Sequence, residues 1–262
     1  TVAFWYQRGE PKRFAPLPAL ADRRWPNLDR IIEGKELLAH SSAQGGTLSL
    51  QKGSPWTGEG QVFCAGGNLQ RLQANRQRPP EVQAQSIERL HDWVEAIRTF
   101  PKPVIAAVEG PAAGAGFSLA LACDLIVAAR NAVFVMAYSS VGLSPDGGGS
   151  WSLARALPRK LVNQLLMGGE RIGAQRLHEL GVVGRLCDAG QALGSALDWA
   201  GQLGARAPNV MASIKELVGE ADRNDLSSHL ALERDHFVRN LHHPNAGIGI
   251  AAFLAKQTPR YE

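Results

Sequence analysis

The chain has 262 residues, of which 45% are hydrophobic and 20% charged, and its formal net charge is +4. This length and apolar content suit one large α/β domain, or a core domain with a helical appendage. The positive excess lies mostly in residues 1–35, which hold seven Lys or Arg against four Asp or Glu. Nucleic-acid-binding domains usually carry a basic stripe instead, so we expect no nucleic-acid partner.

The three cysteines, Cys64, Cys123 and Cys187, are far apart and show no C-x-x-C spacing. This pattern predicts neither a disulfide framework nor a zinc site, so we expect no metal and a reducing, cytoplasmic location. The longest apolar runs are far shorter than a membrane span, and the N-terminal residues lack a secretory signal pattern. We therefore expect no membrane association.

Residues 1–60 show no sustained helical or strand periodicity, and they carry five of the fifteen prolines and three of the six tryptophans. From residue 61 onward, short apolar runs alternate with amphipathic segments and Gly-rich turns, a pattern typical of repeated βα units. The sequence therefore predicts an α/β core within residues 1–200, with residues 1–60 poorly defined, and a helical region over residues 201–262.

The middle of the chain shows the clearest elements. An apolar face at helical spacing from Ile87 to Ile97 predicts a helix that ends near Pro101. The following segments predict a strand, a buried helix and two further strands: Val104–Val108, Gly116–Ala122, Leu125–Ala128 and Val133–Met136. A loop with four glycines over Gly142–Gly149 comes next, and such a loop often lines a site.

The last third of the chain is predicted to be mostly helical. Amphipathic patterns cover Leu161–Met167, Ala174–Leu180, Leu193–Leu203, Val210–Val218 and Leu226–Leu241. These helices carry ridges of Leu, Val and Ile but have few strands to cover. We therefore expect them to pack on the core or on a neighbouring subunit, and packing on a subunit predicts an oligomer.

Two turns rich in Gly and Ala, Phe63–Leu69 and Gly110–Phe117, carry the main chemical signal. Each follows a strand-like segment and precedes a helix-like one. Small residues let a ligand approach the main chain, and free N–H groups at a helix start can bind a developing negative charge. Two such turns together favour an oxyanion hole. For either turn alone, the alternative is that the glycines merely allow tight packing.

These turns and three further segments occur in the order and spacing of a known family. The further segments are Lys102–Gly110, Cys123–Leu125 and Gly142–Gly148. Together they resemble the crotonase superfamily, the enoyl-CoA hydratase/isomerase family, over about three quarters of the chain. The resemblance implies an α/β fold with a spiral of ββα units and a C-terminal helical trimerisation region. It also implies a homotrimer or hexamer that binds acyl-CoA and needs no cofactor besides the coenzyme A of its substrate.

Carried onto this sequence, the resemblance assigns the oxyanion hole to the N–H groups of Gly67 and Ala115. The family's hydratases use two glutamates, and here Ser118 and Tyr138 occupy those positions. Neither can act as a carboxylate base, so we expect Asp146 to be the catalytic residue. Its Pro-Asp loop is similar to that of the superfamily's ring-epoxide isomerases of phenylacetate catabolism. The alternative is that Asp146 only caps the helix beginning near Gly149.

Several further residues are predicted to contact the substrate. Around the acyl group these are Ala65, Asn68, Ser118, Tyr138 and Trp151. The resemblance continues loosely into the C-terminal helices, where Phe253 and Lys256 are predicted to contact coenzyme A. For Asn68 and Tyr138, turn formation or ordinary packing is an equal alternative.

The sequence therefore favours an acyl-CoA isomerase that uses one carboxylate. Hydration or hydrolysis of an acyl-CoA by the same carboxylate is an alternative, as is a non-catalytic protein that keeps the fold to bind another ligand such as RNA. Residues 1–60 lack the family's short coenzyme A-binding motif. They are either a divergent segment or the product of an altered reading frame.

Overall fold

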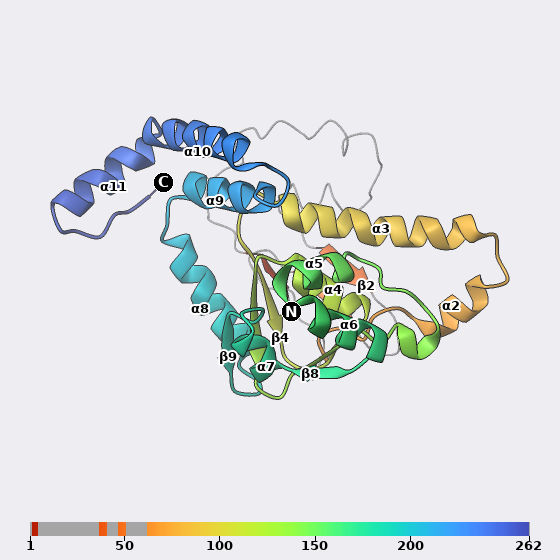
Figure 1. The fold of residues 1–262 in the computed structure, drawn as a ribbon. Coiled ribbons are helices and arrows are strands. Elements are labelled where there is room, and N and C mark those ends of the chain that lie inside the picture. The colour runs from red at the N-terminus through yellow and green to blue at the C-terminus, as the bar shows by residue number, and fades with distance from the viewer. Residues whose placement is uncertain (1, 5–36, 41–46, 51–61, 262) are drawn as a thin grey trace.

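A computed structural model of the chain describes residues 2–4, 37–40, 47–50 and 62–261 (Figure 1). Most of residues 1–60, with the expectations made for them, therefore lies outside the described residues.

The helices are α2 (Leu69–Asn75), α3 (Pro80–Thr99), α4 (Ala115–Ala122), the 3-10 helix η1 (Ser139–Val141), α5 (Gly149–Ala156), α6 (Arg159–Gly168), α7 (Ala174–Glu179), α8 (Ala192–Gly204), α9 (Pro208–Glu220), α10 (Leu226–Leu241) and α11 (Pro244–Leu254). The strands are β1 (Val2–Phe4), β2 (Leu37–His40), β3 (Thr47–Leu50), β4 (Val104–Val108), β5 (Ala112–Ala113), β6 (Leu125–Ala129), β7 (Val133–Val135), β8 (Arg171–Gly173) and β9 (Arg185–Cys187).

The largest sheet in the described part of the chain has the strand order β1-β4-β6-β9. In it β4, β6 and β9 run parallel, and β1 pairs antiparallel with β4. A second sheet has the order β5-β7-β8, and β2 pairs with β3 in a separate hairpin. Parallel neighbours require crossover connections, and α4 lies in the connection from β4 to β6. Strands and helices alternate in this region, as the sequence predicts.

Strand β4 is buried on both faces and joins two parts of the core. Its residues alternate between the faces, so Val104 and Val108 pack in the main apolar cluster while Ile105 and Ala107 pack on the other side, against α8. Helix α8 meets the sheet through a stripe of buried alanines spaced four residues apart, which allows the helix to approach closely. This two-sided burial explains why the strand reads as a continuous apolar run.

Helix α4 is apolar on nearly every side and lies within the main cluster, where the ring centroids of Phe117 and Phe134 are 4.9 Å apart. Gly116 brings α4 against the backbone of Cys64. A Cβ atom at Gly116 would lie 2.3 Å from the Cys64 carbonyl oxygen, so only glycine fits in this arrangement. The start of α4 is thereby fixed beside the turn that follows Phe63.

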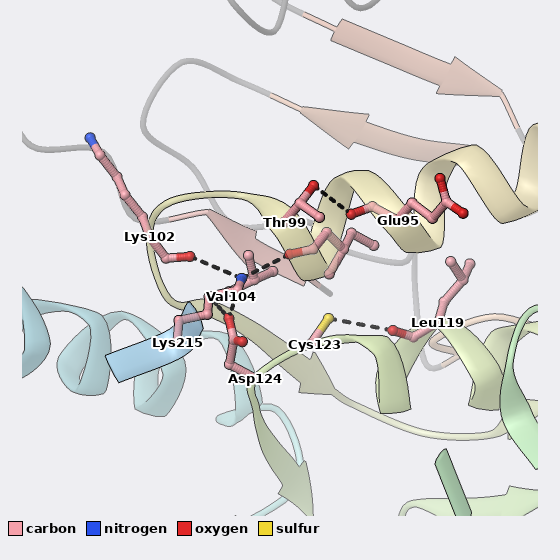
Figure 2. A network of polar contacts seen from close by, with 9 residues as sticks. Glu95, Thr99, Lys102, Val104, Leu119, Cys123, Asp124 and Lys215 are labelled. Carbon is pink, nitrogen blue, oxygen red and sulfur yellow. Dashed lines mark hydrogen bonds and ion pairs between the residues drawn. The ribbon is translucent and has the colours of Figure 1, made fainter. Parts of the chain in front are cut away.

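The C-terminal helices attach to the core through Lys215 of α9. Its ammonium group donates to the carbonyl oxygens of Ile97 at 2.8 Å and Lys102 at 3.2 Å, and to Asp124 Oδ2 at 2.7 Å. The same Asp124 oxygen accepts from the Val104 N–H at 2.7 Å (Figure 2). One side chain thus connects α9 with the end of α3 and with the start of β4.

Helices α9, α10 and α11 expose many large apolar side chains on this single chain. The exposed residues are Ile214, Val218, Leu226, Leu230, Phe237, Val238, Leu241, Ile250, Phe253 and Leu254. Among the described residues, no helix combines the length and apolar character needed to cross a lipid bilayer.

Candidate active site

The two Gly/Ala turns lie side by side in the fold. The Ala113 N–H donates to the Cys64 carbonyl at 2.9 Å, and the Cys64 N–H donates to the Pro111 carbonyl at 3.3 Å. Gly66 has a φ of +86°, and a Cβ atom there would lie 2.7 Å from the Ala113 carbonyl oxygen and 3.4 Å from the Ala115 nitrogen. The first turn therefore sits directly against the start of α4.

The N–H groups of Gly67 and Ala115 are available as donors in this arrangement. Gly67 is exposed in the turn before α2, and Ala115 is the first residue of α4, where helical N–H groups have no partner within the helix. Neither N–H donates to another residue of the described part of the chain. Two adjacent backbone donors, one of them at a helix N-terminus, suit a carbonyl oxygen that gains negative charge.

Asp146 lies in the Gly-rich loop before α5, and two side chains hold it. The Tyr138 hydroxyl donates to Asp146 Oδ1 at 2.6 Å, and the Ser118 hydroxyl donates to the Asp146 carbonyl oxygen at 2.9 Å. The Asp146 residue is half-buried, whereas Ser118 is only 1% exposed. The structure thus brings together three residues that the sequence predicts for the site.

Asp146 does not cap helix α5. The N-cap residue of that helix is Gly148, and no side chain accepts a hydrogen bond from its first turn. The capping alternative considered from the sequence is therefore wrong. The carboxylate points instead toward Tyr138.

Tyr138 links Asp146 to the second turn. A Cβ atom at Gly114, the N-cap residue of α4, would lie 3.6 Å from Cζ and 3.7 Å from the hydroxyl of Tyr138. Burial raises the pKa of the Tyr138 phenol, and the hydrogen bond to Asp146 and the negative charge of that carboxylate raise it further. Tyr138 is therefore a neutral hydrogen-bond donor at physiological pH.

The other predicted acyl contacts have different surroundings. Asn68 caps α2, because its side chain accepts from the Arg71 N–H at 2.9 Å. Ala65 is exposed next to Gly66. Trp151 contacts two guanidinium groups, those of Arg98 at 4.3 Å and Arg155 at 3.8 Å from its ring centroid. A role for these three residues in substrate binding stays a prediction.

Phe253 and Lys256 are the predicted coenzyme A contacts. Both lie away from Asp146 within this chain. Phe253 lies in α11 and is 83% exposed, and Lys256 follows the end of that helix. In Figure 1, α11 projects on the side of the molecule opposite to α2, whereas α4 and α5 lie in the core. Their contact with coenzyme A stays a prediction, and within one chain they are separated from Asp146.

The Asp146 loop packs on residues that no sequence pattern assigned to the site. A Cβ atom at Gly147 would lie 3.2 Å from Leu90 Cδ2, and one at Gly148 would lie 3.8 Å from Val94 Cγ1. Leu90 and Val94 belong to the apolar face of α3. The helical spacing indicated that this face is buried, but it could not indicate which loop it contacts.

The cysteine thiols and possible metal ligands of the described residues were considered as a further site. Burial raises the pKa of the Cys64 thiol, so the thiol is protonated near neutral pH. Across the described residues, no three His, Cys, Asp or Glu side chains are grouped as metal ligands would be.

Comparisons with known proteins identify the family of this chain. The sequence profile of the family described as enoyl-CoA hydratase/isomerase matches residues 56–262. A crystal structure of an enoyl-CoA hydratase from Polaromonas sp. JS666 is 74% identical, covers 78% of this chain and 79% of its own, and superposes with a TM-score of 0.77. The 1,2-epoxyphenylacetyl-CoA isomerase of Escherichia coli (strain K12) is 37% identical over 206 residues, which cover 78% of this chain and 79% of that protein. A carnitinyl-CoA dehydratase of Proteus mirabilis (strain HI4320) is 33% identical over 79% of each chain. These similarities confirm the crotonase-like α/β fold, and the chain belongs to the enoyl-CoA hydratase/isomerase family.

Proposed function

We propose that this acyl-CoA enzyme is an isomerase that moves a double bond, or rearranges a ring, in an enolisable acyl-CoA. The thioester oxygen accepts hydrogen bonds from the N–H groups of Gly67 and Ala115. Asp146 removes a proton from one carbon, and the electron pair of the broken C–H bond forms an enolate whose negative charge rests on that oxygen. The proton on Asp146 then returns to another carbon, which regenerates the carboxylate.

One observation carries this proposal: the Tyr138 hydroxyl bonds Asp146 at 2.6 Å while the Tyr138 ring lies against Gly114, next to Ala115. Tyr138 thereby contacts both the Asp146 carboxylate and the turn that contains the Ala115 donor. With Ser118 and Tyr138 at the positions of the family's two glutamates, Asp146 is the carboxylate that can serve as a base. A single carboxylate suffices for isomerisation, because the proton that leaves one carbon is returned to another.

A second candidate is hydration, with Asp146 activating a water molecule. The names of several relatives favour it, including the Polaromonas hydratase and a 2,3-dehydroadipyl-CoA hydratase of Escherichia coli (strain K12) that is 31% identical. Hydration also requires a proton for the second carbon, and the proton that Asp146 takes from water could supply it. The assay below therefore distinguishes the two reactions by their products.

We further propose that the enzyme acts as a homotrimer or hexamer in a reducing compartment such as the cytoplasm. The exposed apolar side chains of α9, α10 and α11 support the assembly, because a surface of this kind needs a partner in water. The three cysteines are all free, which agrees with a reducing location.

A spectrophotometric assay with 2-enoyl-, 3-enoyl- and ring-type acyl-CoA substrates tests the reaction. We expect wild-type enzyme to isomerise at least one class, and Asp146→Ala to lose about 100- to 10,000-fold in kcat, as removal of a general base does. Asp198→Ala, an exposed aspartate on α8, is the matched control and should keep wild-type kinetics. Isomerisation that persists in folded Asp146→Ala would refute the role of Asp146.

A further inference from the structure

The two positions at which the family resemblance places glutamates both contact Asp146. Tyr138 reaches its side chain and Ser118 reaches its main chain, at 2.6 Å and 2.9 Å respectively. A tyrosine hydroxyl donating to a carboxylate at this distance forms a charge-assisted hydrogen bond, which is shorter and stronger than one between neutral groups. Both side chains are thus bound to the residue that we assign as the base.

We propose that Tyr138 is a positioning residue that fixes one oxygen of Asp146, so that the other oxygen, Oδ2, carries the proton between the two carbons. This inference rests on the proposed function. Among the described residues no donor is bonded to Oδ2, whereas Oδ1 is engaged by the phenol. Tyr138 itself neither gives nor takes a proton during the reaction.

Ser118 also helps to hold the Asp146 loop in place, because the loop backbone packs on it. A Cβ atom at Gly149 would lie 2.5 Å from Ser118 Oγ, and one at Gly147 would lie 3.1 Å from Ser118 Cβ. The backbone of the Asp146 loop therefore packs directly on Ser118 and fills the space that a longer side chain at this position would need. The small side chain and the two glycines together allow the loop to place its carboxylate beside Tyr138.

The direction of the Tyr138 hydroxyl follows from its packing. Tyr138 is 9% exposed. Its ring lies against Gly114, and its hydroxyl reaches Asp146. Removal of the hydroxyl leaves the ring contacts in place and frees the Asp146 side chain to rotate. Loss of alignment between a base and its substrate lowers the rate of the chemical step and leaves substrate binding nearly unchanged.

The test is the kinetics of Tyr138→Phe beside Tyr261→Phe, the same chemical change at a tyrosine near α11. We expect Tyr138→Phe to lower kcat by about 10- to 100-fold, as a misaligned base does. Its KM should stay within about twofold of wild type, because the phenol contacts Asp146 and not the substrate. Tyr261→Phe should match wild type. A Tyr138→Phe enzyme with wild-type kcat would overturn the proposal.

A double-mutant cycle with Asp146→Asn, measured in single turnovers at high enzyme concentration, separates positioning from direct catalysis. If Tyr138 acts through Asp146, adding Tyr138→Phe to Asp146→Asn causes no further loss of rate. A further loss of about tenfold or more would mean that Tyr138 acts on the substrate itself, which overturns the positioning role and leaves the isomerase intact. Wild-type activity of Asp146→Asn alone would instead refute the proposed function.

Discussion

At the scale of single residues, Tyr138 determines how the site responds to alkaline pH. Its folded-state pKa is raised above the ordinary value near 10, first by burial and then by the bond to Asp146. A raised folded-state pKa means that the neutral phenol is favoured in the folded protein. Stability from this group is therefore present below pH 10 and is lost as the pH rises toward the folded-state pKa.

An ultraviolet titration of tyrosinate checks this behaviour. We expect the spectrum of wild type minus Tyr138→Phe to show no tyrosinate up to about pH 10, the ordinary tyrosine value. The phenol would also remain a donor to Asp146 over that range. A difference signal that titrates at or below the ordinary value would show that the hydroxyl is neither buried nor bonded to the carboxylate.

Gly116 is a second residue whose identity the site requires. Its substitution by alanine would place a Cβ atom 2.3 Å from the Cys64 carbonyl oxygen, so the first turn and α4 must separate. We expect Gly116→Ala to lose about 1–3 kcal/mol in the free energy of unfolding, measured by urea denaturation, and most of its activity.

Gly201 is the matched control for this change. It lies inside α8 with no atom within 4 Å of a built Cβ. Gly201→Ala should therefore gain up to about 1 kcal/mol, because alanine favours a helix over glycine. Equal effects of the two substitutions would show that the turns are not in close contact.

At the scale of elements, Lys215 connects the C-terminal helices to the core. Its side chain is 11% exposed, and its three donors are all used. Replacement by methionine leaves the Asp124 carboxylate and two carbonyl groups without this donor. We expect Lys215→Met to lower the free energy of unfolding by about 1–3 kcal/mol, because a partly exposed carboxylate and two carbonyl groups lose a charged donor.

Lys160→Met provides the control, because Lys160 is exposed on α6, and substitutions at such sites stay within about 0.5 kcal/mol. The combination of Lys215→Met with Asp124→Asn should cost less than the sum of the two single changes, since the carboxylate is then no longer left charged. Additive losses would contradict the contact seen between Lys215 and Asp124.

The sequence predicted the elements whose burial follows a simple pattern. The strand Val104–Val108 was predicted with its exact bounds, because Pro103 precedes it and every residue is apolar and buried. The buried helix α4 was predicted to within one residue at its start. Helix α3 begins several residues before the predicted apolar face, because Pro80 suits a first helical position and the residues up to Ser86 are mostly polar.

Other elements were missed for physical reasons. Strands β8 and β9 are three residues long, too short to show periodicity, and pairing with distant strands defines them. Helix α11 lies within the region predicted to be helical, but its bounds were not predicted, because its Gly-Ile-Gly-Ile segment alternates like a strand and contains two poor helix formers. In the site, the resemblance supplied Gly67, Ala115 and Asp146. The contact between Tyr138 and Asp146 depends on the path of η1 and of the left-handed Gly142 between them, which the sequence does not specify.

At the scale of the whole molecule, the exposed apolar face of α9, α10 and α11 predicts assembly. We expect light scattering to give the mass of a trimer or hexamer for wild type, and Phe237→Glu to dissociate it, because a charge would then be buried at the interface. Met167→Glu, an equally exposed apolar position on α6, is the control and should remain assembled. A monomeric wild type would refute the predicted assembly.

We have proposed that the oxyanion donors and the single carboxylate Asp146 perform isomerisation. The most direct test is chromatography with mass detection of the products formed from a 3-enoyl-CoA by wild type and by Asp146→Ala. We expect a 2-enoyl product of unchanged mass with wild type and almost none with the variant. A product heavier by one water molecule, formed equally by both proteins, would contradict it.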